Sequence, residues 1–221
     1  MTSAEMNTLL SLRMEDVGGS NFTATVRNNA LNVGQRILCN YLDESYLSEL
    51  EFRDVITVDS QGINSGMVQL SGDGSFGTTM NKSTHKPIRN NIQNVQIKVG
   101  TTYRYAIHMD FKDVKKIEND YLGADEENPL FWVFGPNIHI RPMTGASQVV
   151  LYYIKSPATI SDAQNCELNE SLHEIVVDLA ENELWRQDNN SKRGEIARAN
   201  AMDHIKVLNA RLKVEGPDEL E

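Results

Sequence analysis

The sequence predicts an α+β protein in which a helical bundle, formed by both ends of the chain, carries an inserted antiparallel β domain. Two helical patterns fill residues 168–214, a third helical pattern fills residues 22–42, and the apolar period changes from 3.6 to 2 at Phe52. We therefore expect a bundle at 1–52 and 158–221 and a β domain at 53–157. The C-terminal helices need cover from other helices, so we expect the two ends of the chain to pack together.

The first helix is expected to begin after Thr2, which has the three-residue spacing to Glu5 of a capping box, and to run to about Arg13. In the next helix, Gly34 costs up to about 1 kcal/mol relative to alanine, which indicates close packing there. Residues 43–51 fit one or two further helical turns. The apolar face of the second helix is expected to hold Phe22, Val26, Ala30, Val33, Ile37 and Tyr41, with Leu31, Leu38 and Leu42 beside it.

Several strands are predicted in the middle of the chain, at 55–58, 67–70, 103–111 and 149–154, with a hairpin over 130–141 that turns at Gly135-Pro136-Asn137. The clearest pattern is in 103–111, where five apolar residues alternate with polar ones and are expected to face the core. Residues 112–128 are charged and are expected to form an exposed loop. The five alternating residues are Tyr103, Tyr105, Ile107, Met109 and Phe111.

The C-terminal helix pair begins with Ser171 and Glu174, which again have the spacing of a capping box. Gly216-Pro217 is typical of a helix end and stops the second helix. The first helix is expected to bury Leu172, Ile175, Val176, Leu179 and Leu184, and the second Ile196, Ala199, Met202, Ile205, Leu208 and Leu212.

The net charge of −10 lies at the two ends of the chain. Residues 1–52 carry 7 acids and 3 bases, residues 158–221 carry 14 and 7, and residues 53–157 carry 10 and 11. Such a surface repels phosphates, which disfavours a DNA-binding module. No apolar run approaches the ~18 residues of a membrane span, so no membrane association is expected. Cys39 and Cys166 lack disulfide or metal spacing and are expected to be reduced in a cytoplasmic compartment.

No catalytic residue, cofactor or metal site is predicted. Residues 72–77 match G-x-G-x-x-G, but no helical pattern and no suitably placed acid follow them. A small soluble enzyme that binds a nucleotide or another ligand through this glycine-rich loop stays as the alternative. His173 lies near Glu170 and Glu174, yet no second histidine or cysteine falls at ligand spacing. The basic cluster Lys82, Lys86 and Arg89 fits a contact with an acidic neighbour or with phosphates.

The order of these features resembles the head-to-tail adaptor, or connector, proteins of tailed bacteriophages. The resemblance is carried by RNNAL at 27–31, PLFWVFGPNIHIRP at 129–142, VLYYIKSP at 150–157 and LAE at 179–181. It implies a structural virion protein of the neck, not an enzyme, that is assembled in the host cytoplasm. It also implies a ring, typically of twelve copies, that docks under the portal and continues the DNA channel toward the tail.

The resemblance implies partners as well: the portal protein, tail or neck proteins, and genomic DNA that passes through without sequence-specific binding. Twelve copies at −10 would place about 120 negative charges in one ring, which suits a channel along which DNA slides. Tail or neck contacts are expected at Lys82, Lys86 and Arg89. Because the C-terminal end of these adaptors often reaches toward the portal, the portal-contact candidates are Val214, Asp218, Glu219, Leu220 and Glu221.

Overall fold

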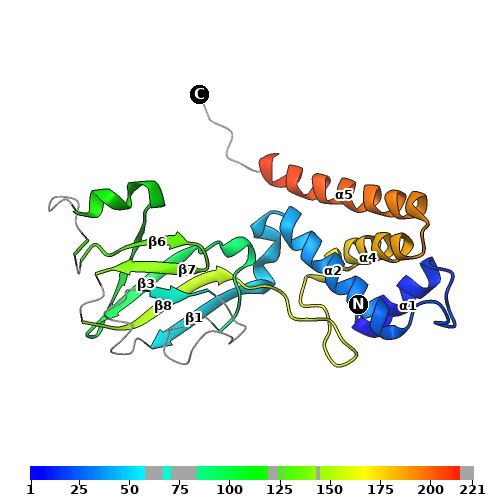
Figure 1. Cartoon of the computed structure of the whole chain (residues 1–221), viewed down its shortest axis with the longest axis horizontal. Helices are drawn as coiled ribbons and strands as arrows, with labels where there is room; N and C mark the ends of the chain where they lie inside the picture. The colour runs from blue at the N-terminus through cyan, green and yellow to red at the C-terminus, as the bar shows by residue number, and fades with distance from the viewer. Residues whose placement is uncertain (58–66, 71–83, 119–123, 126, 143–144, 215–221) are drawn as a thin grey trace. The chain divides into compact units, whose positions relative to one another are not determined.

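The computed structural model describes residues 1–57, 67–70, 84–118, 124–125, 127–142 and 145–214. The chain divides into two compact units, Met1–Leu50 with Pro157–Glu221 (the helical unit) and Glu51–Ser156 (the β unit), where the sequence analysis placed the boundaries at 52/53 and 157/158. The predicted fold class is confirmed: antiparallel sheets lie in the sequence between N-terminal and C-terminal helices (Figure 1).

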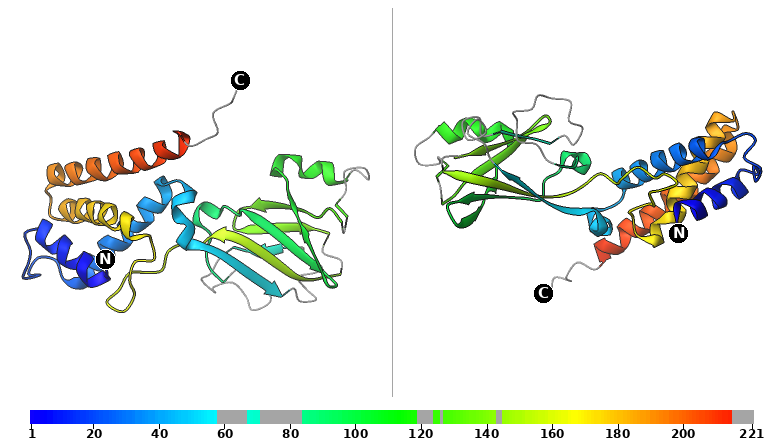
Figure 2. Two further views of the ribbon diagram at one scale, coloured as in Figure 1. Left: turned by 180° about the vertical axis from the view of Figure 1, so that it is seen from behind. Right: turned by 90° about the horizontal axis from the view of Figure 1, so that it is seen from below.

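Helix α4 (His173–Gln187) is the centre of the helical unit. It lies between α2 (Ala24–Tyr41) and α5 (Ser191–Val214), and α1 (Ser3–Arg13) also packs on it (Figures 1 and 2). The N-terminal helices therefore cover the C-terminal pair, as expected. Neighbours on several sides bury α4 almost all round, so that polar Asp178 and Asn182 are buried along with the expected apolar face.

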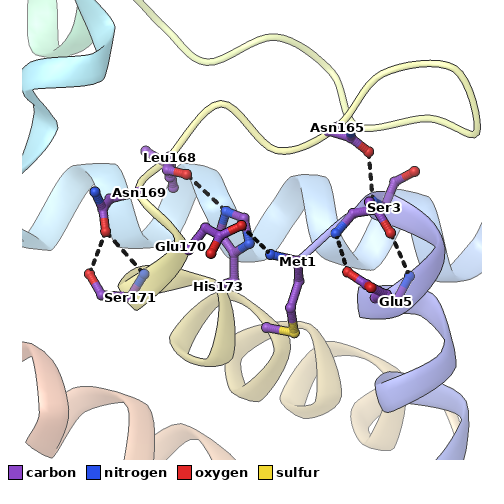
Figure 3. A network of polar contacts seen from close by, with 10 residues as sticks. Met1, Ser3, Glu5, Asn165, Leu168, Asn169, Glu170, Ser171 and His173 are labelled. Atoms are coloured by element: carbon purple, nitrogen blue, oxygen red, sulfur yellow. Dashed lines mark hydrogen bonds and ion pairs between the residues drawn. The ribbon is translucent and has the colours of Figure 1, made fainter.

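The capping box predicted at Thr2 and Glu5 is confirmed, and the one predicted at Ser171 and Glu174 is wrong. Thr2 Oγ1 accepts from the Glu5 backbone, and Glu5 Oε2 accepts from the Thr2 backbone at 2.6 Å. Around Ser171, however, Asn169 Oδ1 accepts from both the backbone N and the hydroxyl of Ser171 (Figure 3). Asn169 thereby caps the 3-10 turn η4 (Glu170–Leu172), and α4 starts after it without a side-chain cap. A capping box is recognised from residues three positions apart, whereas an asparagine side chain can accept from the backbone N–H two positions on.

Helix α2 buries Leu31 and Leu38, and Leu42 directly after its end is buried as well. The close packing predicted at Gly34 is confirmed, because a Cβ there would lie 2.6 Å from the Val176 carbonyl oxygen of α4. This approach sets which side of α2 meets α4. The expected face is therefore partly wrong: Phe22 and Ala30 are buried, Val26, Val33 and Ile37 are half-buried, and Tyr41 is exposed.

Helix α5 buries a stripe of mostly small residues. Gly194, Ala197 and Ala201 lie on α4 together with Ile205, whereas Ile196 is 57% exposed. A Cβ on Gly194 would lie 3.1 Å from the Asn182 carbonyl oxygen, so the missing side chain permits the close approach. The predicted face is confirmed at Ile205 and wrong at Ile196 and Ala199, while Met202, Leu208 and Leu212 are half-buried.

The described strands of the β unit form two four-stranded sheets. Sheet A has the order β1 (Glu51–Thr57), β8 (Ala146–Ile154), β3 (Asn94–Val99), β4 (Thr102–Tyr105). Sheet B has the order β2 (Met67–Gln69), β7 (Asn137–Arg141), β6 (Leu130–Phe134), β5 (Ile107–His108). All pairings are antiparallel except β5 with β6. The core of this unit contains Ile56, Val68, Val95, Ile97, Phe131, Ile138, Ile140, Val149 and Leu151.

The hairpin β6–β7 is confirmed, with Gly135 at φ +58° in its turn. The strand β3 was not predicted, although it pairs with both β8 and β4. Residues 111–118 form a 3-10 helix, η3 (Phe111–Glu118), where a loop was expected. Two shorter 3-10 segments, η1 (Glu44–Leu50) and η2 (Ile88–Asn90), precede β1 and β3.

The expected core face of 103–111 is wrong. The segment divides into β4 of sheet A and β5 of sheet B, and its buried residue is Ala106 between them. Tyr105 is 64% exposed, and Ile107 and Phe111 are more than half exposed. Alternation predicts that one face is apolar, but it does not say whether the same chain covers that face.

Candidate functional site

The candidate contact residues lie partly within the described structure. Val214 is the last residue of α5, whereas residues 218–221 and Lys82 lie outside the described ranges. Lys86 and Arg89 are both exposed on the β unit, on either side of two buried residues. The Lys86 carbonyl accepts from the backbone N of Ser156 at 2.7 Å, which ties this segment to the end of β8. The glycine-rich loop at 72–77 also lies outside the described residues.

His173 cannot serve a surface metal site, because it is 2% exposed. Its Nε2–H donates to the Leu168 carbonyl oxygen at 2.8 Å (Figure 3). Within the described ranges, no group of three or more His, Cys, Asp or Glu residues could hold a metal ion. Cys39 and Cys166 are both buried and not disulfide-bonded, and burial raises the pKa of the Cys166 thiol.

The two sheets differ in how their outer faces are covered. On sheet B, η3 packs against β6 (Figure 1), and the Phe111 ring stacks on Phe134 with 4.6 Å between centroids. Trp132 on that face is only 8% exposed and stacks on His139, whose pKa is lowered first by burial and then by Arg141. On sheet A, the outer face is exposed at Val55, Tyr103 and Tyr105 but buried at Val150.

The outer face of sheet A, which we call the tyrosine face, follows from the strand register. Arg53 pairs with Tyr152, and Lys98 pairs with Tyr103, so these side chains project from the same side of the sheet. Val55, 43% exposed, and Tyr105 lie on the same side. The residues on the tyrosine face include three tyrosines, two cations, one acid and two aliphatic residues: Tyr103, Tyr105, Tyr152, Arg53, Lys98, Glu51, Val55 and Val150.

Hydrogen bonds fix this face across all four strands. Arg53 Nε donates to the Tyr152 hydroxyl at 3.3 Å, and that hydroxyl donates to Gln96 Oε1 at 3.2 Å. The Tyr103 hydroxyl donates to Gln148 Oε1 at 3.2 Å, and the Lys98 ammonium lies 5.6 Å from the Tyr103 ring centroid. Ordered tyrosine and arginine side chains contribute much of the binding energy at protein interfaces, so this face suits a protein partner.

A second candidate surface is an open groove of about 660 Å³ in the helical unit, which we call the acidic groove. Arg13 bridges Asp178 and Glu181, and Arg193 lies over the Trp185 ring at 4.8 Å. These arginines leave a net negative lining, because five carboxylates face two guanidinium groups. The acids of the groove are Glu15, Glu174, Asp178, Glu181 and Asp203.

The charges of the two units differ as a whole. Residues 1–50 and 157–221 contain 20 acids and 10 bases, and residues 51–156 contain 11 of each. The helical unit therefore carries the whole net charge of −10, and the β unit carries none.

The chain matches no protein-family model and no curated protein. Over the ranges that the structure describes, no helix has the length and apolar character needed to cross a membrane.

Sequence reasoning found the tyrosines of β4 but assigned them to the core. The missing information was β3, because only its register with β4 shows that Tyr103 shares a side with Lys98. The acidic groove could hardly be predicted from the sequence, because its residues come from α1, α4, α5 and the segment after α1, and only the packing of these helices brings them together.

Proposed function

We propose that this protein is a head-to-tail adaptor of a tailed bacteriophage: a structural ring subunit that docks under the portal and lines the DNA channel toward the tail. The observation that carries the proposal is the separation of charge, −10 on the helical unit and 0 on the β unit. An acidic unit that faces the channel repels DNA phosphates, so DNA moves past without being bound.

Two further features support the proposal. The four strings that carry the resemblance fall in or on regular elements: α2, the β6–β7 hairpin, β8 and α4. The chain also has two unlike surfaces, the tyrosine face and the acidic groove. A ring is built from heterologous contacts, in which one surface of each subunit meets a different surface of the next.

In this proposal the ring holds about twelve copies in the neck of the virion, between portal and tail. Its C-terminal residues Val214, Asp218, Glu219, Leu220 and Glu221 contact the portal. Its basic residues Lys82, Lys86 and Arg89 contact tail or neck proteins.

The test is genetic and structural. Removing the gene from the phage genome that carries it should give filled heads and free tails that do not join, and supplying the protein should restore infectious particles. Electron microscopy of complete particles should then place the protein as a ring at the neck. Infectious particles of normal appearance without the protein would refute the proposal.

A further inference from the structure

We infer that residues 157–165, which we call the strap, open locally while the helices of their unit stay packed, and that a main-chain clamp on α2 holds the strap closed. The chain passes between the two units at 50/51 and at 156/157, so the strap begins at one of these two crossings. Its opening frees the chain next to that crossing. The inference concerns the helical unit alone and does not depend on the proposed function.

The clamp is the side-chain amide of Asn32, which binds the main chain of Ile160 as a neighbouring strand would. Its Oδ1 accepts from the Ile160 backbone N at 2.7 Å, and its Nδ2 donates to the Ile160 carbonyl oxygen at 2.9 Å. The same amide accepts from Gln35 Nε2 at 3.0 Å and donates to the Asn28 carbonyl oxygen at 2.9 Å. Both N–H groups and both lone pairs of the amide are therefore used, which fixes its orientation.

Two further amides of α2 extend the clamp along the strap. Gln35 donates from Nε2 to the Ala158 carbonyl oxygen at 2.8 Å, and Asn28 Nδ2 donates to Asp162 Oδ1 at 3.1 Å. Residues three and four apart share one side of a helix, and alternate residues share one side of an extended chain. The amides at 28, 32 and 35 therefore meet residues 162, 160 and 158 in antiparallel order.

The strap buries little apolar surface of its own. Its buried side chain is Ile160, at 1% exposed, whereas residues 159 and 162–165 are exposed. The turn at its tip closes on itself, because Ser161 and Gln164 exchange backbone hydrogen bonds of 3.0 and 3.1 Å. A segment with one buried apolar side chain opens at a lower free energy than a helix that is buried on several sides.

The other printed anchors of the strap are also single hydrogen bonds. The Ala158 backbone N donates to Glu167 Oε2 at 2.9 Å. Asn165 Oδ1 accepts from the backbone N of Ser3 at 2.8 Å (Figure 3). The strap is consequently held mainly by polar contacts, among which the clamp on Ile160 is the one that engages both groups of a peptide unit's neighbours.

Opening leaves the helices packed, because the strap and α4 meet different sides of α2. Gly34 faces α4, where a Cβ would lie 2.6 Å from the Val176 carbonyl oxygen. At 3.6 residues per turn, Gly34 lies about 100–160° round the helix from the three amides. The amides can therefore release the strap without disturbing the contact between α2 and α4.

The experiment is backbone hydrogen exchange, read by NMR on the full chain in a urea series below the unfolding transition. In wild type, the Ile160 amide should exchange through an opening whose free energy depends little on urea, because little surface is exposed. The amides of Leu179 and Ala180 in α4 should exchange through an opening with a steep urea dependence, since it exposes the whole core of the unit.

Asn32→Ala removes the clamp, and Asn29→Ala is the matched control. Asn29 is exposed on the same helix, and its side chain makes no hydrogen bond within the part of the chain that the structure describes. In Asn32→Ala, the protection of the Ile160 amide should fall roughly tenfold or more beyond any change at Leu179 and Ala180, because both main-chain groups of Ile160 lose their partner. Asn29→Ala should match wild type at all three amides.

A steep urea dependence at Ile160 in wild type overturns the inference, because the strap then opens only when the whole unit unfolds. An equal loss of protection at Ile160, Leu179 and Ala180 in Asn32→Ala also overturns it, since Asn32 then stabilises the unit as a whole. Unchanged protection in Asn32→Ala, or an equal loss in Asn29→Ala, shows that the clamp does not hold the strap. If Asn32→Ala does not fold, the wild-type urea series decides alone.

Discussion

Replacing Gly34 by alanine tests how closely α2 and α4 pack. A Cβ at this position would lie 2.6 Å from the Val176 carbonyl oxygen, 3.2 Å from the Ala180 nitrogen and 3.4 Å from the Leu179 Cβ. A favourable C–H···O contact has its atoms roughly 3.3–3.6 Å apart, so α2 would have to move away by about 0.7 Å or more. Two of the three neighbouring atoms are backbone and cannot rotate aside.

The expected cost follows from two opposing effects. Overpacking a tight core costs about 1–3 kcal/mol, and the rigid helix backbone places this site at the upper end of that range. Alanine regains up to about 1 kcal/mol through its higher helix propensity. The net result is a free energy of unfolding lower by about 2 kcal/mol, which corresponds to a melting temperature lower by roughly 5–10 °C for a unit of this size.

The assay is thermal and urea unfolding followed by the helical signal at 222 nm, because the long helices all belong to the helical unit. Gly18→Ala is the matched control, since a Cβ at Gly18 meets nothing within 4 Å. The control should unfold within about 0.5 kcal/mol of wild type. If Gly34→Ala melts at or above the wild-type temperature, the close approach of α2 to α4 is wrong.

Three other predictions address the α5 face, the β core and the C-terminal end. Ile205→Asp places a charge at a position that is 2% exposed and should lower the free energy of unfolding by roughly 4 kcal/mol or more. Asp203→Ala removes only an exposed ion pair and should change stability little. Equal unfolding midpoints for the two variants would contradict the assigned face. Tyr153→Phe removes a buried hydroxyl that donates to Asp54 Oδ2 at 3.0 Å and should cost about 1–3 kcal/mol. Burial, and then the Asp54 charge, raise the pKa of Tyr153 from 10.0 to about 12, so its protonated form is favoured in the folded state. Wild type should therefore lose stability between about pH 10 and pH 12, and the phenylalanine variant should lack that loss in urea melts across this range. Deleting residues 214–221 should leave melting nearly unchanged but prevent incorporation into particles, and a truncated protein that still joins the portal would place docking elsewhere.

The sequence predicted the helices better than it predicted their orientations. The position of a helix follows from local signals, such as the Thr2–Glu5 cap and the long apolar period of α5. Its rotation depends on which side can approach a neighbour most closely, and on α5 the small residues Gly194, Ala197 and Ala201 decide this. A hydrophobicity pattern gives little weight to such residues and therefore favoured Ile196, one position away from Ala197.

The strands show a different limit. β3 has the sequence Asn94 to Val99, in which Asn94, Gln96 and Lys98 alternate with the apolar residues Val95, Ile97 and Val99. This pattern is short. Its partner β4 follows directly after the two-residue turn Gly100-Thr101, but its other partner, β8, is distant along the chain and is identified only by the pairing. Without β3, the tyrosine face had no register, and its hydrogen bonds between Tyr152 and Gln96 could not be anticipated.

The wrong prediction for residues 103–111 bears on function. The alternation of Tyr103, Tyr105 and Ile107 with polar residues is as regular as that of a strand packed on a core, yet these side chains are exposed. Alternation shows that a strand has one apolar face, but an antiparallel sheet can leave one of its faces in solvent, so the pattern alone does not show that the apolar face is buried. Hydrogen bonds and a cation–π contact hold Arg53, Lys98 and the tyrosines in place on this exposed face, and this order is what suits the face to a protein partner.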